Sequence, residues 1–309
     1  MGRQMRRTCW LSVDYDFFVR SLGIWDWAHK ESPFFRSGFI WQTRVAPFVM
    51  QGVDLRDEMD PSKHANPLPS SFWTILQQLG YDFKYTDFFV VADSHAGAGS
   101  IFNEMARDII GEPAEVLVNF DAHHDLGYCD WNQLVGLAEQ GQCTCDTWLC
   151  SLMQWYPDLA SRIVFPDWMR GEYPIKEQVG SIRKVLPREM LSRVKMDFFT
   201  KKNGAISPVV IEPGETLDVE GVFVCRSGAW VPPWLDKSFV QFVKEGERVI
   251  GHPPMTPFDD DDTPALEPRT DFDYGEAVRL GEQWSLMQNN LMQKVLSDRR
   301  DDDDDNGDK

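Results

Sequence analysis

Two carboxylates and an imidazole stand at alternate positions directly after an apolar segment in the middle of the chain. Residues 116–120 are apolar except for Asn119, and Asp121, His123 and Asp125 follow them. An apolar run of this length predicts a buried strand, and open α/β sheets bind ligands at the carboxyl ends of their strands. Asp and His side chains at this spacing can hold a hard or borderline divalent cation. The segment therefore predicts a metal-binding strand end.

Two further predicted strands end in similar groups. Residues 8–13 run into Asp14 and Asp16, whose side chains point to the same side if the strand continues through them. Residues 88–92 are followed by His95. The alternative for the two aspartates is a turn in which a carboxylate caps backbone N–H groups. Because the ends of parallel strands lie side by side, residues from all three strands can meet at one edge of a sheet.

Together these strand ends supply four carboxylates and two imidazoles. This set suits two divalent cations about 3.5 to 4 Å apart. Four carboxylates neutralise two such cations, and a centre of this kind tolerates a positively charged substrate. Oxygen-rich ligation without thiolates favours Mn²⁺ over zinc. We therefore predict two Mn²⁺ ions as cofactors, held by Asp14, Asp16, His95, Asp121, His123 and Asp125.

Three short motifs carry a resemblance to the arginase and agmatinase ureohydrolases. Residues 12–16 resemble their Ser-x-Asp-x-Asp motif, and residues 121–125 resemble their Asp-Ala-His-x-Asp. Residues 92–95 are similar to their Gly-Gly-Asp-His element, although the Gly pair is missing. The segments Asp-Tyr-Asp-Phe-Phe and Asn-Phe-Asp-Ala-His-His-Asp-Leu are closest to the branch that contains the peptide arginases. Residues 146–149 resemble the Gly-Asn-Trp-Ile-like element of that branch.

The resemblance implies an α/β fold with three layers, α/β/α, and a mainly parallel sheet, as in arginases and deacetylases. It also implies that a metal-bridging hydroxide attacks a guanidinium carbon and releases urea. The substrate would be a small guanidino metabolite or an arginine side chain in a peptide. In the family the Asp-x-Asp strand follows the other two motifs, whereas here it comes first. The resemblance therefore implies a circularly permuted chain, and often an oligomer, so a homo-oligomer is compatible with it.

Four residues are candidates for catalysis or substrate binding. By the resemblance, Asp125 would hold the hydroxide or relay its proton, and His124 could reach the departing amine or pack away from the metals. Glu212 follows a predicted strand and could pair with a guanidinium. Asp146 precedes a predicted helix, which it would cap, and is a second candidate for substrate binding. The chain has no counterpart of the proton-transferring histidine of arginases, so the general acid stays open.

Two other functions remain open. One is a deacetylase-like amide hydrolase on the same fold with a single zinc held by Asp, His and Asp. A complete second site at Asp14 and Asp16 would count against it. The other is a degenerate binding protein without catalytic activity, whose aromatic surface and acidic tail engage a basic partner.

Composition restricts the partners. The chain has 309 residues, a net charge of -18 and a pI near 4.7, which argues against binding nucleic-acid phosphates and suits a cationic substrate. No apolar run approaches the roughly 20 residues of a membrane span, and we expect no signal peptide and a cytoplasmic location. Four of the six cysteines fall between residues 129 and 150; reduced thiols are favoured over structural zinc.

The predicted organisation is one metallohydrolase domain with a C-terminal appendage. The domain spans residues 1–255 and includes an aromatic-rich excursion at 23–69 that would cover the mouth of the site. An acidic Pro/Asp linker at 256–272 leads to a helix at 273–299 that packs on the domain. An acidic tail at 300–309 is expected to be disordered. Further helices are predicted at 71–79, 101–110, 145–156 and 236–244, and further strands at 162–165, 208–211 and 221–226.

Overall fold

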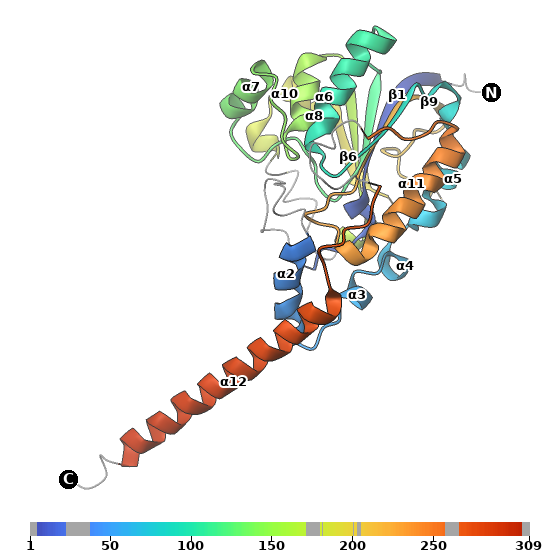
Figure 1. Ribbon diagram of the computed structural model, residues 1–309. Coiled ribbons are helices and arrows are strands. Elements are labelled where there is room, and N and C mark those ends of the chain that lie inside the picture. Colours follow the sequence, from blue (N-terminus) through green and yellow to red (C-terminus); the bar gives the residue numbers. More distant parts are fainter. Residues whose placement is uncertain are drawn as a thin grey trace.

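A mostly parallel sheet with helices on both faces forms the body of the protein (Figure 1). The computed structural model describes residues 5–22, 38–170, 180, 182–199, 201–202, 205–256 and 266–304. The predicted three-layer α/β/α fold is confirmed. Among the described residues, no helix has the length and apolar character needed to cross a membrane.

The main sheet has seven strands in the order β2-β9-β1-β4-β5-β6, and β3 pairs with β9 beside β2. All of these pairs are parallel. A separate antiparallel pair joins Lys201–Lys202 (β7) and Ala205–Ile206 (β8). The seven strands are β1 (Met5–Asp14), β2 (Tyr81–Asp82), β3 (Phe88–Ala92), β4 (Val116–Phe120), β5 (Ala160–Phe165), β6 (Val194–Phe198) and β9 (Glu215–Cys225).

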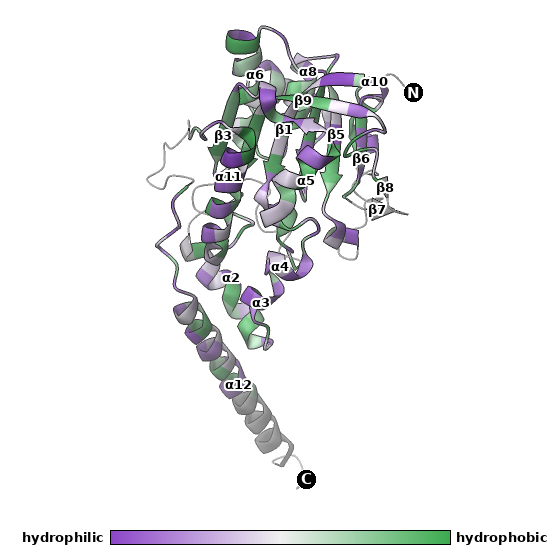
Figure 2. Cartoon of the chain, turned by 90° about the vertical axis from the view of Figure 1, so that its right-hand side faces the viewer, coloured by the Kyte–Doolittle hydropathy of each residue, from purple (hydrophilic) through white to green (hydrophobic). Residues whose placement is uncertain are grey.

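The central strands are buried on both faces, which explains their continuous apolar sequences. Along β1, Leu11 and Val13 belong to one core cluster while Trp10 belongs to the other, as the two-residue period of a strand requires. By the same period, Ser12 and Asp14 lie on the side of Trp10. The first core lies under helices α5 (Phe72–Leu79) and α11 (Asp236–Ile250), which cover one face of the sheet in Figure 2.

The other face is covered by α6 (Ala96–Met105) and α8 (Trp148–Trp155), whose buried residues join the second core. Gly99 lets these helices approach closely, because a Cβ there would lie 3.2 Å from the carbonyl oxygen of Trp148.

The remaining elements are α2 (Gly38–Met50), α3 (Leu55–Glu58), α4 (Pro61–His64), α7 (Trp131–Glu139), α10 (Arg188–Leu191), α12 (Tyr274–Asp304), the π-helix Ala106–Ile110 and the 3-10 helices Tyr15–Phe18, Pro69–Ser71, Phe83–Tyr85, Asp167–Arg170 and Pro233–Leu235.

The strands predicted before the three ligand-bearing segments are confirmed, as are those at 162–165 and 221–226. The strand predicted at 208–211 is wrong. Residues 208–210 form a turn, in which the N–H of Val210 bonds to the carbonyl of Ser207 at 3.0 Å. Strand β6, at the end of the sheet order, was not predicted, although its alternation of apolar and charged residues is typical of a strand with one exposed face.

Helix ends differ from prediction at two places near the site. α6 begins at Ala96 instead of residue 101, since the glycines that disfavour a helix on propensity allow close packing here. α8 begins at Trp148, and its N-cap residue is Thr147 instead of Asp146. The Thr147 hydroxyl accepts the N–H of Thr144 at 3.1 Å, and the Asp146 carboxylate accepts the Thr144 hydroxyl at 2.6 Å instead of capping the helix.

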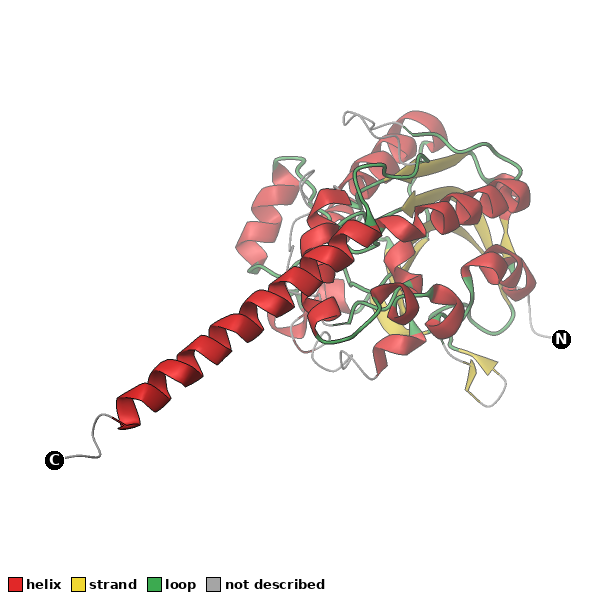
Figure 3. Ribbon diagram, turned by 60° about the horizontal axis from the view of Figure 1, so that its bottom comes forward, coloured by secondary structure: helices red, strands yellow, loops and turns green. Residues whose placement is uncertain are grey.

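Helix α12 packs on the domain through its first turns. Ala277 is buried, and Gly281 touches Val49 of α2 so closely that a Cβ there would lie 2.8 Å from the Cβ of Val49. Beyond this contact the helix projects away from the domain (Figures 1 and 3), and Met287 and Leu291 are exposed. It ends at Asp304, inside the segment predicted as tail, because extending an existing helix is easier than starting one.

Two predicted features lie outside the described residues. The first part of the aromatic excursion falls in 23–37, and the acidic run of the linker falls in 257–265. The described part of the excursion contains helices α2, α3 and α4.

Candidate metal centre

The carboxylate of Asp14, at the end of β1, has two roles. Oδ1 of Asp14 accepts the N–H of Asp16 at 2.9 Å and caps the 3-10 helix that follows. Its other oxygen, Oδ2, lies 3.2 Å from Nδ1 of His95. The capping interpretation and the ligand interpretation of this motif are therefore compatible, because each uses a different oxygen.

Asp121 occupies the middle of the cluster, directly after β4. Oδ1 accepts the N–H of His123 at 2.7 Å, and Oδ2 accepts the side-chain amide of Asn119 at 3.1 Å. These bonds fix the carboxylate plane, so that Oδ2 also lies 3.2 Å from Nδ1 of His95 while Oδ1 lies 3.5 Å from Nδ1 of His123. One carboxylate thus faces both imidazoles.

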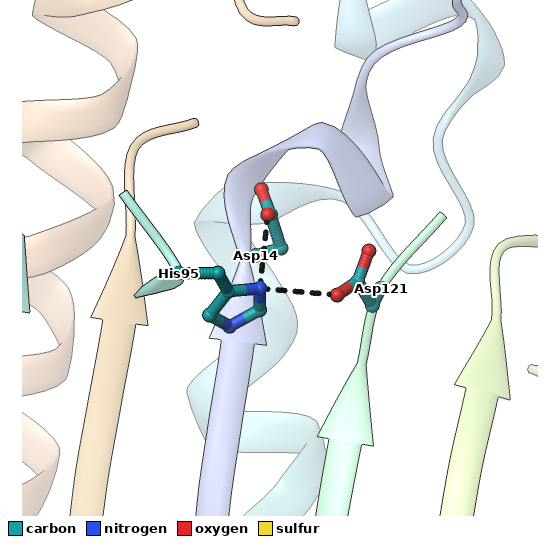
Figure 4. Close-up of side chains that lie close together, drawn as sticks. All are labelled: Asp14, His95 and Asp121. Carbon is teal, nitrogen blue, oxygen red and sulfur yellow. Dashed lines mark ion pairs between the residues drawn. The ribbon is translucent and has the colours of Figure 1, made fainter. Parts of the chain in front are cut away.

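His95 enters from the end of β3, at the start of α6. Its Nδ1 is surrounded by Oδ2 atoms of Asp14, Asp121 and Asp125 at 3.2, 3.2 and 3.1 Å, and the first two are drawn in Figure 4. Its Nε2 lies 2.8 Å from the hydroxyl of Ser12. A proton on Nε2 that is donated to Ser12 leaves Nδ1 as the ligand atom.

His123 forms the second group with Asp16, whose Oδ2 lies 3.0 Å from Nδ1 of His123. The imidazole also packs beside Trp230, with ring centroids 5.0 Å apart. Its side chain is 18% exposed, whereas those of the other five predicted ligands are at most 4% exposed. The side of His123 is therefore the more open side of the centre.

The predicted ligands fall into two overlapping groups. Asp14, His95 and Asp121 form one, and Asp16, Asp121 and His123 form the other; within each, the ligand atoms lie within 4.8 Å of one another. Asp121 belongs to both, and Asp125 faces the first through its contact with His95. The strand ends at residues 16 and 123 thus meet in space, which the two-metal hypothesis requires.

Crowded buried carboxylates shift each other's protonation. Burial, together with the charges of Asp16 and Asp121, raises the pKa of Asp14 to about 7. Burial and the charge of Asp121 also raise the pKa of Asp16 and of Asp125. Burial alone would raise the pKa of Asp121 as well, but hydrogen bonds to His123 and His95 hold it below its usual range. A bound cation would relieve this repulsion.

The donor set fits a divalent cation. Oδ1 of Asp16 accepts the N–H of Ala122 at 3.2 Å, and its buried Oδ2 faces Nδ1 of His123 at 3.0 Å without a well-aligned hydrogen bond from the described residues. A buried carboxylate oxygen without a well-aligned donor is costly unless a cation satisfies it. The three carboxylates and two imidazoles of the two groups could hold a metal ion.

His124 lies beside the ligands but belongs to neither group. Its Nδ1 accepts the N–H of Leu126 at 3.1 Å, and its ring packs on Tyr128 at a centroid distance of 4.4 Å. Burial, with the charge of His123, lowers the pKa of His124 to about 3, so the ring is neutral at neutral pH. The catalytic role of His124 stays a prediction.

Glu212 and Asp146 are not brought into the cluster. Glu212 precedes β9 at the amino end of the strands, where it accepts a hydrogen bond from Lys195 at 2.6 Å, because the strand expected to carry it to the other edge is a turn. Asp146 lies in the turn before α8 and accepts the hydroxyl of Thr144 at 2.6 Å. Neither ligand group includes a cysteine.

Several residues that hold the cluster in place were not among the candidates from the sequence. Ser12 had a signal, since it stands two positions before Asp14 on the same strand face. Asn119 and Trp148 lie within motifs that resemble the ureohydrolases, but an amide in a strand and an indole in a helix gave no indication of their hydrogen bonds to Asp121 and Asp125. The end of β9, between β3 and β1, carries Arg226, which bonds to Asp93 at 2.7 Å and supplies no ligand.

Comparisons with protein-family models, curated proteins and solved structures gave no match to this chain. The resemblance to the ureohydrolases therefore rests on the motifs, and the circular permutation that it implies stays a prediction.

Proposed function

We propose that this protein is a hydrolase with two divalent metal ions that cleaves a guanidino group and releases urea. The substrate would be an arginine side chain in a peptide or a small guanidino metabolite. The observation that carries the proposal is the position of Asp121 between His95 and His123, which makes two ligand groups with one shared carboxylate.

The geometry favours two ions over one. A deacetylase-like site needs one ion held by Asp, His and Asp, and the group around His95 would suffice for it. Asp16 and His123, whose Oδ2 and Nδ1 lie 3.0 Å apart, would then form an ion pair that binds no metal ion. Their closeness to Asp121 supports a second ion, and metal sites with a shared carboxylate are typical of two-metal hydrolases.

Two bound cations would lower the pKa of a water molecule and stabilise negative charge that develops on it. The protein's own residues hold the reacting groups in place. Asp125, 3.1 Å from Nδ1 of His95, lies on the side of the first group and could accept a proton. His123, the most exposed ligand, lies on the side from which a substrate would approach.

Charge supports a cationic substrate. The four carboxylates of the cluster cancel the charge of two M²⁺ ions, so a guanidinium does not meet a strongly positive centre. The net charge of -18 would also attract a cation over a longer range. Mn²⁺ remains the preferred metal, because every ligand is an oxygen or an imidazole nitrogen.

Metal content and urea release test the proposal together. Protein purified without chelator, or loaded with Mn²⁺, should contain close to two Mn per chain by elemental analysis. Urea should be released from at least one of free arginine, agmatine and arginine-containing peptides. Asp16→Asn should abolish release, whereas Glu212→Gln and Asp146→Asn, outside the cluster, should not. Absence of bound metal after Mn²⁺ loading would overturn the proposal, and one zinc per chain would favour the deacetylase-like alternative.

A further inference from the structure

Each carboxylate of the cluster is oriented by a hydrogen-bond donor, and Asp125 differs from the others in its donor. Asp14, Asp16 and Asp121 each accept a backbone N–H from a residue of the same strand ends. Asp125 accepts the indole N–H of Trp148, with Nε1 2.6 Å from Oδ2. Asp121 accepts the Asn119 side-chain amide as well as a backbone N–H, whereas the orientation of the Asp125 carboxylate depends on the Trp148 side chain and can be changed by mutation.

Helix α8 holds Asp125 at two points. The backbone N–H of Leu149 donates to the carbonyl of Asp125 at 3.2 Å, while Trp148 holds the carboxylate. Asp125 has a φ of 52°, in the left-handed region that residues other than glycine seldom adopt. Such a conformation persists when surrounding contacts impose it. The start of α8 supplies two such contacts.

Trp148 is itself fixed in place. It is fully buried, and its ring lies 5.1 Å from that of His95 and 6.3 Å from that of Phe102. The close approach of Gly99 to the backbone and Cβ of Trp148 fixes the other end of the residue. The indole therefore has little freedom to turn away from Asp125.

We propose that Trp148 is a positioning residue for the metal group around His95. The oxygen that it holds, Oδ2 of Asp125, is the one that faces Nδ1 of His95 at 3.1 Å. The indole N–H thereby directs the Asp125 carboxylate toward the ion that Asp14, His95 and Asp121 would share, and its hydrogen bond goes to Asp125 and not to Asp16 or His123. This inference rests on the metal centre of the proposed function.

The test compares Mn²⁺ affinity in matched variants by calorimetric titration of metal-free protein. Trp148→Phe removes the N–H and keeps an aromatic ring. Removal of a second hydrogen-bond partner of a metal ligand typically weakens binding by about 10- to 100-fold, and here we expect that loss for one of the two ions. Trp73→Phe is the control. Trp73 is also buried and donates its N–H to the carbonyl of Phe242 at 2.9 Å, far from the cluster, so both affinities should stay unchanged.

A second variant covers the case in which Trp148→Phe does not fold. Replacement of Trp148 by 3-benzothienylalanine keeps the bicyclic shape and lacks only the N–H donor. Weaker binding of one ion in this variant, with the thermal stability of the parent, supports the inference; two unchanged affinities overturn it. Failure of the unaltered protein to bind Mn²⁺ would instead overturn the proposed function, so the two failures are distinguishable.

Discussion

The hydroxyl of Ser12 lies 2.8 Å from Nε2 of His95, and this contact turns the opposite nitrogen toward three carboxylates. Ser12→Ala should leave the ring less well oriented and weaken Mn²⁺ binding about 10-fold, since outer partners of a histidine ligand fix its tautomer. Calorimetric titration measures the change. Ser161→Ala, which alters a buried serine on β5, is the control. Equal affinities in both variants would contradict the role of Ser12.

The shared position of Asp121 predicts a difference between two single substitutions. Asp121→Asn should remove both ions, because this carboxylate belongs to both ligand groups. Asp16→Asn should remove one, because Asp16 belongs to the group of His123 only. Elemental analysis after gel filtration should give close to zero and close to one Mn per chain. Equal metal loss in the two variants would show that the centre is not shared in this way.

Glu220 predicts a pH-dependent stability. Burial, with the charges of Asp87 and Asp218, raises the pKa of Glu220 above its ordinary value of 4.5. The contribution of Glu220 to the free energy of unfolding is therefore fully present below pH 4.5, its ordinary pKa, and is lost as the pH rises through the higher pKa of the folded state. Glu220→Gln should raise the free energy of unfolding at pH 7 and change it little at pH 4. Urea denaturation at both values tests this, with the exposed Glu104→Gln as control.

The buried pair of Arg162 and Glu215 predicts a large loss of stability. Two hydrogen bonds of 2.7 Å join the side chains, and both are at most 2% exposed. Arg162→Met leaves the buried Glu215 carboxylate with the N–H of Glu212 at 2.9 Å and the more distant Arg7 at 3.8 Å, which should cost about 3 to 5 kcal/mol.

Lys195→Ala provides the comparison, because it breaks the exposed pair with Glu212 and should cost at most about 1 kcal/mol. Urea denaturation measures both variants, and similar losses would contradict the difference in burial.

The position of α12 predicts which part of it stabilises the domain. A chain that ends at Gln283 keeps the buried Ala277 and the contact of Gly281 with α2, so its melting temperature should equal that of the full chain. Gly281→Val should lower the melting temperature, because its Cβ would lie 2.8 Å from that of Val49. A marked loss of stability in the shortened chain would show that the projecting part has a stabilising contact.

The ligand cluster was predictable because each ligand follows an apolar strand. Asp14, His95 and Asp121 end three such strands, and parallel strands bring their ends together. The same reasoning gave a wrong position for Glu212, because the apolar residues before it form a turn at the opposite edge of the sheet. Apolar runs of four residues do not distinguish a short strand from a packed turn.

The supporting residues could not be predicted, for a different physical reason. Trp148 reaches Asp125 through the packing of α8 on α6, which depends on the space left by Gly99. The position of β9 between β3 and β1 likewise depends on tertiary structure, since the apolar sequence of a strand does not determine which strands it pairs with.

The pairing of β1 with β9 has a consequence for the order of events during synthesis. Of the strands that the structure describes, β1 is made first and β9 last, yet they pair from Met5 and Glu215 to Asp14 and Cys225. Pairing between distant segments forms slowly, and synthesis delivers the N-terminal part first. A nascent chain that stops before residue 215 lacks one of the two strands that flank β1. Under the proposed function, the group around His95 would therefore be complete only once β9 has formed, because β9 lies between β3 and β1.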